Sequence, residues 1–174
     1  MFYRPMIRKV SRLLAWAAAA LIGVALLVTA TGYALPQSHV ASGEARLPAP
    51  PDVVFRAITE VGRYPEWRTD IARVDIVTTA PLTWREYDAR GDAITYEVVE
   101  SRAAARHRVR IADPGLPFGG TWTYELQPDD AGTRLVVTEH GDVYNPIFRF
   151  MSRFVFGHTA SIDAFLAALA RRVG

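Results

Sequence analysis

Two ionisable side chains, Glu139 and His107, occupy positions where the sequence predicts an apolar strand face. In the expected strands 106–112 and 134–142, alternation with a period of two places each of them in line with aliphatic neighbours. A carboxylate or imidazole that faces an apolar cavity is costly unless paired, and a shifted pKa there would suit proton transfer or recognition of a ligand hydroxyl. The alternative is an edge position near solvent, or an ion pair with an arginine such as Arg149. Glu139 and His107 are therefore candidate catalytic residues.

Large aromatic side chains form a second set of candidates, for binding rather than catalysis. Tyrosine and tryptophan can line an apolar pocket while their polar tips remain available to a ligand. An ordinary core filled by the same side chains is an equally good interpretation, and the sequence does not separate the two. The candidate ligand-binding residues are Trp67, Trp84, Tyr96, Trp122, Tyr124, Phe150 and Phe154, together with Glu139.

The usual signatures of metal and cofactor enzymes are missing from the sequence. It contains no cysteine and no G-x-S-x-G, H-E-x-x-H, P-loop or G-x-G-x-x-G motif. The four histidines, His39, His107, His140 and His158, show no metal-binding spacing. We therefore expect neither a metal nor a cofactor.

The elements that position these residues begin with an apolar segment. Residues 13–35 carry no charge, and about 20 such residues cross a hydrocarbon core of about 30 Å as a helix. Four basic residues lie in the preceding segment 1–12, so we expect that segment to be cytoplasmic and the rest of the chain, after a linker at 36–39, to be extracytoplasmic. A cleaved signal peptide is the competing interpretation, because Gly32 and Ala34 are small residues at plausible cleavage spacing.

The charge of the remaining chain argues against nucleic acid as a partner. The four basic residues ahead of the apolar segment belong to a total of 20, so from position 35 onward 16 basic residues face 18 acidic ones. A mildly acidic domain has no general attraction for a phosphate backbone. The sequence pI of about 9.1 therefore reflects the four basic residues ahead of the apolar segment rather than a nucleic-acid surface.

The soluble part has the periodicity of an α+β domain. A strand at 40–47 is followed by a short amphipathic helix that begins at Asp52 and by a further turn at 64–67. Asn145 caps, and Pro146 begins, a long C-terminal helix with apolar residues at i, i+3, i+4 and i+7. Because only this helix is long enough to cover a sheet, the sheet must curl around it. The six expected strands between these parts are 71–79, 82–89, 93–101, 106–112, 121–127 and 134–142.

The first half of the C-terminal helix is apolar on more than one face. Phe148 lies off the main apolar stripe, and Arg149 and Arg153 are one turn apart. One explanation is that one face meets the sheet and the other the membrane interface, where arginine and phenylalanine are favoured. Burial by the short helices explains the pattern equally well.

This order of elements resembles the SRPBCC superfamily, also called START-like or Bet v 1-like. The matching segments are Pro-Ala-Pro-Pro-Asp-Val-Val-Phe at 48–55, Tyr-Pro-Glu-Trp at 64–67 and the Phe-rich final helix. The nearest group is that of polyketide cyclases/dehydrases and lipid-transport proteins, and the resemblance covers residues 40–174. It implies a helix-grip fold, in which a seven-stranded antiparallel sheet curls around a long C-terminal helix, two short helices follow the first strand, and a hydrophobic cavity lies between sheet and helix.

We expect a membrane-anchored binding protein that holds a lipid-like or polyketide-like molecule in this cavity, beside the bilayer that supplies it. A first alternative is a cyclase, dehydratase or hydrolase that acts on such a ligand with Glu139 as acid or base, assisted by Tyr124 or His107. A second is a structural or protein-interaction module of the cell envelope. A shared fold does not select among these functions.

Overall fold

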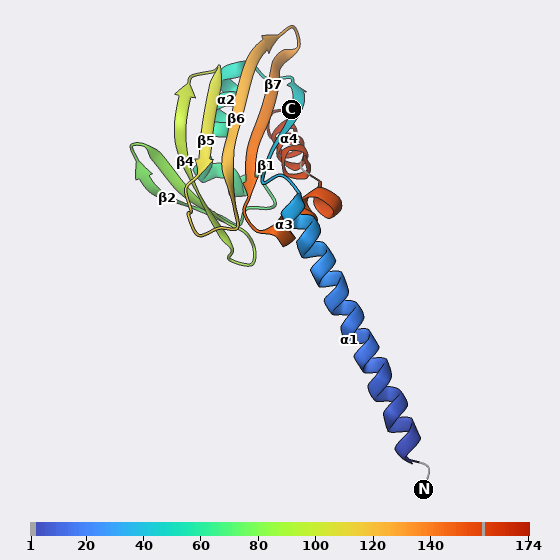
Figure 1. Ribbon diagram of the computed structural model, residues 1–174. Coiled ribbons are helices and arrows are strands. Elements are labelled where there is room, and N and C mark those ends of the chain that lie inside the picture. The colour runs from blue at the N-terminus through green and yellow to red at the C-terminus, as the bar shows by residue number, and fades with distance from the viewer. Residues whose placement is uncertain (1–2, 158) are drawn as a thin grey trace.

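The chain folds as a long N-terminal helix followed by one α+β domain, and the helix extends away from the domain (Figure 1). The computed structural model describes residues 3–157 and 159–174. The elements are α1 (Tyr3–Ala34), β1 (Ser38–Leu47), α2 (Pro51–Thr59), the 3-10 helix η1 (Val61–Glu66), β2 (Arg73–Thr79), β3 (Leu82–Tyr87), β4 (Ala93–Arg102), β5 (Arg106–Ile111), β6 (Phe118–Asp129), β7 (Gly132–Val143), α3 (Pro146–Met151), the π-helical turn η2 (Ser152–Phe156) and α4 (Ala160–Val173).

The seven strands form one antiparallel sheet in the order β1-β7-β6-β5-β4-β3-β2. The strands from β2 to β7 form a meander, and β1 closes the sheet against β7. Each expected strand is present, with ends that differ by up to three residues. With the two short helices α2 and η1 after the first strand, this confirms the predicted helix-grip fold.

One face of the sheet, here called the inner face, packs against α2 and α4. Leu135 and Val137 of β7 are fully buried there, as are Ile58 of α2 and Ile162 and Leu169 of α4. Fully burying one such aliphatic side chain contributes roughly 1.5–3 kcal/mol. This packing holds the inner face and its side chains in a defined position.

The C-terminal helical region consists of two helices rather than the single long helix expected. The beginning is as predicted, since Asn145 accepts hydrogen bonds from two backbone N–H groups and Pro146 takes the first helical position. The helix widens into the π-helical turn η2 and stops at Gly157, whose φ of +76° is accessible to glycine at little cost. Only α4, after this break, lies across the sheet; α3 packs against α1 instead.

Helix α3 is held at the domain end of α1 by Arg149. The guanidinium donates hydrogen bonds to the carbonyls of Val143 (2.7 Å) and Tyr144 (3.0 Å). It also donates to the carbonyls of Gly32 and Leu35, both at 3.4 Å, at the C-terminal end of α1. A cation there satisfies carbonyls that the helix leaves without partners. Arg149 therefore connects α1, β7 and α3.

We expect Gly32→Ala to separate α3 from α1, and Gly23→Ala to leave their packing intact. A Cβ at position 32 would overlap the backbone carbonyl of Pro146, whereas one at position 23 would meet nothing within 4 Å. In the full chain in detergent micelles, amide hydrogen exchange in α3 should be about tenfold faster in Gly32→Ala, because local opening becomes easier. Equal exchange rates in the two variants would contradict this packing.

Candidate functional site

Most of the aromatic candidates gather on the inner face of the sheet. Trp84 and Tyr96 are cross-strand neighbours whose rings stack at 5.5 Å between centroids. The ring of Phe165 in α4 lies 5.4 Å from that of Tyr124 and 6.2 Å from that of Trp122. Trp67, which follows η1, closes the group at 5.8 Å from Phe165. Five of the predicted binding residues thus belong to one cluster on the inner face: Trp67, Trp84, Tyr96, Trp122 and Tyr124.

A buried ion pair lies beside these rings, between Arg68 and Glu86. The guanidinium of Arg68 is 3.1 Å from the carboxylate of Glu86, which also accepts a hydrogen bond of 2.9 Å from the Trp84 indole. Arg68 pairs with Asp70 at 2.6 Å as well. Glu86 is 6% exposed, so the pair sits in a low-dielectric surrounding where each charge depends on the other.

Sequence reasoning missed Arg68 and Glu86, although one signal was available. Glu86 follows Trp84 by two residues in β3, so the alternation that points Trp84 inward points Glu86 inward too. Arg68 lies in a loop, where no periodicity applies. Its guanidinium is 5.0 Å from the ring centroid of Tyr64 and 5.8 Å from that of Phe165, and such cation–π contacts help to hold it among aromatic side chains.

Burial controls the protonation of this cluster. It raises the pKa of Glu86, although Arg68 and the Trp84 indole favour the charged form. It also raises the pKa of Tyr96 and Tyr124, so both phenols stay protonated over the physiological range. Neither phenol has a hydrogen-bond partner among the described residues, which leaves two O–H groups able to donate to a ligand oxygen.

His107 lies on the inner face as predicted, but its surroundings favour the neutral form. It is 3% exposed, Phe55 meets its ring edge-on with 6.1 Å between centroids, and burial lowers its pKa to about 4. Its Nδ1 is 3.2 Å from the Ser101 hydroxyl. A general acid or base works best with a pKa near the operating pH. The proposed catalytic role of His107 therefore gains nothing from this environment.

Glu139 also lies on the inner face, two strands away from His107. It is the cross-strand partner of Trp122, with which it shares a hydrogen bond, and burial raises its pKa. Its carboxylate is 4.0 Å from the Nε2 of His39. A carboxyl group of raised pKa suits proton donation, so acid–base chemistry at Glu139 stays a prediction.

Phe150 and Phe154 do not join the other candidates. They belong to α3 and η2, where their rings contact each other at 4.9 Å, and Phe154 is 59% exposed. The break at Gly157 is the reason, because it separates their segment from α4. The alternative ion pair between Glu139 and Arg149 is not formed either, since Arg149 is engaged by backbone carbonyls.

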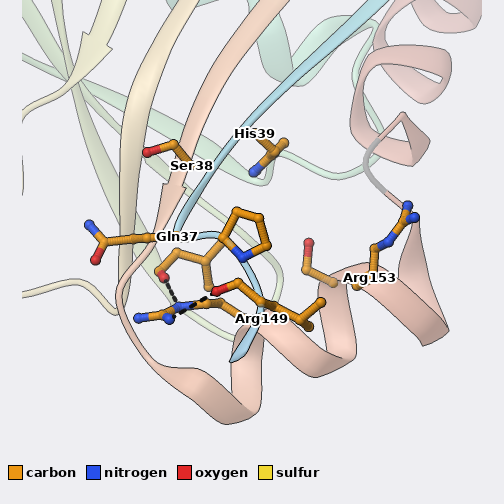
Figure 2. Close-up of a pocket in the computed structure, with 9 residues that line it drawn as sticks. Gln37, Ser38, His39, Arg149 and Arg153 are labelled. Atoms are coloured by element: carbon orange, nitrogen blue, oxygen red, sulfur yellow. Dashed lines mark hydrogen bonds between the residues drawn. The ribbon is translucent and has the colours of Figure 1, made fainter. Parts of the chain in front are cut away.

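Two pockets lie at opposite ends of the domain. The first, about 380 Å³, is where α1 meets the domain, and Figure 2 shows Arg149 and Arg153 at its two ends with His39 and Ser38 above them. The second, about 310 Å³, lies between Trp67 and the end of α4. Neither pocket lies between the sheet and α4, where the cavity was expected. The first pocket is lined by Leu35, Pro36, Gln37, Ser38, His39, Val143, Arg149, Ser152 and Arg153.

No group of three histidine, aspartate or glutamate side chains is placed to hold a metal ion within residues 3–157 and 159–174. His158, one of the four histidines considered above, lies outside the described residues.

Comparison with known families identifies this arrangement. A family model described as polyketide cyclase / dehydrase and lipid transport matches residues 38–174. The chain belongs to this family. The match takes in the whole sheet, α4 and the inner-face cluster. A search of functionally curated proteins finds no significant match.

Solved structures share the fold of this chain. A START superfamily protein from Mycobacterium smegmatis superposes with a TM-score of 0.62 at 15% identity, covering 78% of this chain and 97% of its own. A norcoclaurine synthase point mutant from Thalictrum, in complex with a transition-state analogue, superposes with a TM-score of 0.62 at 12% sequence identity. The superposition covers 78% of this chain and 94% of the synthase. The di-domain ARO/CYC StfQ from the steffimycin biosynthetic pathway superposes with a TM-score of 0.63 at 13% sequence identity, and the superposition covers 79% of this chain and 51% of StfQ. At these identities the likeness is one of fold.

Proposed function

We propose that this protein is a membrane-anchored binding protein for a hydrophobic small molecule, lipid-like or polyketide-like, held on the inner face of the sheet beneath α4. The observation that carries the proposal is the pair of inward phenols, Tyr96 and Tyr124, that have no hydrogen-bond partner among the described residues. Aromatic walls with a few convergent polar groups are typical of small-molecule sites. The buried charge of Arg68 beside them would favour a ligand that carries a carbonyl, hydroxyl or acidic group.

The anchor is supported by one helix that is long and apolar enough to cross a membrane. It runs from Arg12 to Ala34, 23 residues, and none of its most apolar window is buried against the domain. At about 1.5 Å per residue it is long enough for a hydrocarbon core of about 30 Å. With basic residues ahead of it, we expect the N-terminus to be cytoplasmic and the domain extracytoplasmic. Intact mass of the membrane-extracted protein would reveal cleavage of a signal sequence.

Ligand binding is testable by native mass spectrometry of the full chain extracted in detergent. We expect a co-purifying hydrophobic compound, and we expect Tyr124→Phe to lower its occupancy about fivefold, the effect of losing one hydrogen bond worth roughly 1 kcal/mol. Tyr144→Phe is the matched control, because Tyr144 is 48% exposed and outside the inner face. Both variants should unfold at the wild-type temperature. A chain that never carries a compound, or equal occupancy in the two variants, would contradict the proposal.

A further inference from the structure

The pocket at the junction of α1 and the domain continues the inner face of the sheet. His39 of β1 and Val143 of β7 point to the same side as Glu139, because residues two apart on a strand share a face. The His39 ring occupies the space that a side chain at Gly141 would fill. Beyond these residues, η2 forms the far wall of the pocket (Figure 2).

This pocket carries positive charge. Arg149 is fixed at one end by its hydrogen bonds to backbone carbonyls, shown in part by dashed lines in Figure 2. Arg153, at the other end, is exposed and has no hydrogen bond or ion pair with any described residue. The two nearby carboxylates are engaged and do not line the pocket: Asp142 accepts a hydrogen bond of 2.5 Å from the Ser38 hydroxyl, and Glu139 faces His39.

The pocket also lies at a defined height above the apolar span. The span ends at Ala34, and the pocket lining begins at the next residue, Leu35. If α1 crosses the bilayer, the pocket therefore lies level with the lipid headgroups. The elements that supply Arg149 and Arg153, α3 and η2, also carry exposed apolar side chains, namely Ile147, Phe148, Phe154 and Val155.

We propose that this pocket binds the phosphate of an anionic phospholipid from the adjacent leaflet. Arg153 donates to the phosphate oxygens, since a guanidinium matches phosphate geometry, and Arg149 adds fixed positive charge. The exposed side chains of α3 and η2 contact the acyl chains, as in an interfacial helix. A volume of about 380 Å³ is within the range of small-molecule sites. The inference rests on the proposed function, because it takes α1 as the anchor.

The test uses the full chain in a neutral detergent, with native mass spectrometry after addition of phosphatidylglycerol or phosphatidylcholine. We expect wild-type protein to retain phosphatidylglycerol over phosphatidylcholine, and Arg153→Gln to reduce phosphatidylglycerol retention about fivefold or more. Arg171→Gln is the matched control, because Arg171 is an exposed arginine near the C-terminus, which lies at the end of the domain away from α1 (Figure 1). It should retain the lipid as the wild type does.

Equal loss of phosphatidylglycerol from both variants, or no loss from Arg153→Gln, would overturn the headgroup site. Inorganic phosphate that displaced the lipid at equal concentration would overturn the lipid as its ligand, because the site would then recognise free phosphate. Extraction of membranes with alkaline carbonate separates this failure from that of the proposed function. Protein that stays in the membrane but fails the lipid test rejects the pocket alone, whereas protein released by carbonate rejects the anchor and the pocket together.

Discussion

Replacing Glu86 with alanine is expected to lower the free energy of unfolding by about 3–5 kcal/mol, the cost of removing one partner of a buried ion pair. The guanidinium of Arg68 would lose the partner 3.1 Å away that faces it from inside the domain, and the Trp84 indole would lose its acceptor. An arginine cannot discard its charge, so it would remain buried and only partly compensated by Asp70. Urea denaturation of the full chain in detergent, followed by tryptophan fluorescence, measures the loss.

Glu97→Ala is the matched control for this measurement. Glu97, like Glu86, pairs with an arginine. Its partner, Arg110, lies on the neighbouring strand at 3.0 Å, but Arg110 is 52% exposed and solvent screens the pair. We expect the control to cost less than about 1 kcal/mol. Replacing both partners of the buried pair, Arg68→Met with Glu86→Leu, should recover much of the stability lost in Glu86→Ala. Equal costs for Glu86→Ala and Glu97→Ala would show that the buried pair does not stabilise the domain.

The fold was easier to predict from the sequence than the candidate site, because the fold depends mainly on local patterns. Strand alternation and turn residues determine which side chains share a face, so Trp122, Tyr124, His107 and Glu139 were correctly placed on the inner face. These are local properties of the chain, and the alternation of apolar and polar residues in the sequence indicates them directly. The curl of the sheet around the last helix followed from the same elements, and the family resemblance added the helix-grip arrangement of all seven strands.

Two features depended on information that is not local. Arg68 reaches Glu86 from a loop 18 residues away, and the periodicity of the sequence does not predict this contact. The apolar pattern of residues 147–156 is equally compatible with covering the sheet and with meeting another surface; the break at Gly157 decides between them. A glycine inside a helical pattern is tolerated often enough that its effect on direction has to be observed.

The inner face and the junction pocket together separate two kinds of chemistry along one surface. The deep part carries tyrosine hydroxyls and a compensated ion pair among aromatic rings, which suits an apolar body with few polar atoms. The outer end carries an arginine with no partner among the described residues, Arg153, which suits an anionic group. Glu139 and His39 lie between the two parts. This division is compatible with a single amphiphile or with two separate ligands. If one amphiphile spans both parts, Tyr124→Phe and Arg153→Gln should reduce the binding of the same compound, whereas with two ligands each variant should affect a different one.

The contribution of His107 to the free energy of unfolding is expected to fall as the pH is lowered from about 6.5 towards 4. Burial holds its pKa at about 4 in the folded chain, below the value of 6.5 for an exposed imidazole. Between these values the unfolded chain binds a proton that the folded chain does not, so the free energy of unfolding decreases with decreasing pH. At about 1.4 kcal/mol per pH unit, the full loss amounts to about 3 kcal/mol. Above pH 6.5 the contribution is complete and constant.

A His107→Gln variant isolates this contribution, since glutamine keeps a polar group facing Ser101 and does not titrate. Buried Glu86 and half-buried Glu139 act with the opposite sign. Their pKa values are raised in the folded chain, so Glu86 and Glu139 favour folding as they take up protons in acid. Both are present in the wild type and in the variant, and the difference between the two unfolding curves measured from pH 7.5 to 4.5 therefore reports His107. Parallel pH profiles would show that the imidazole has the same pKa in the folded and the unfolded chain, near 6.5, which would restore His107 as a candidate for acid–base chemistry on the inner face.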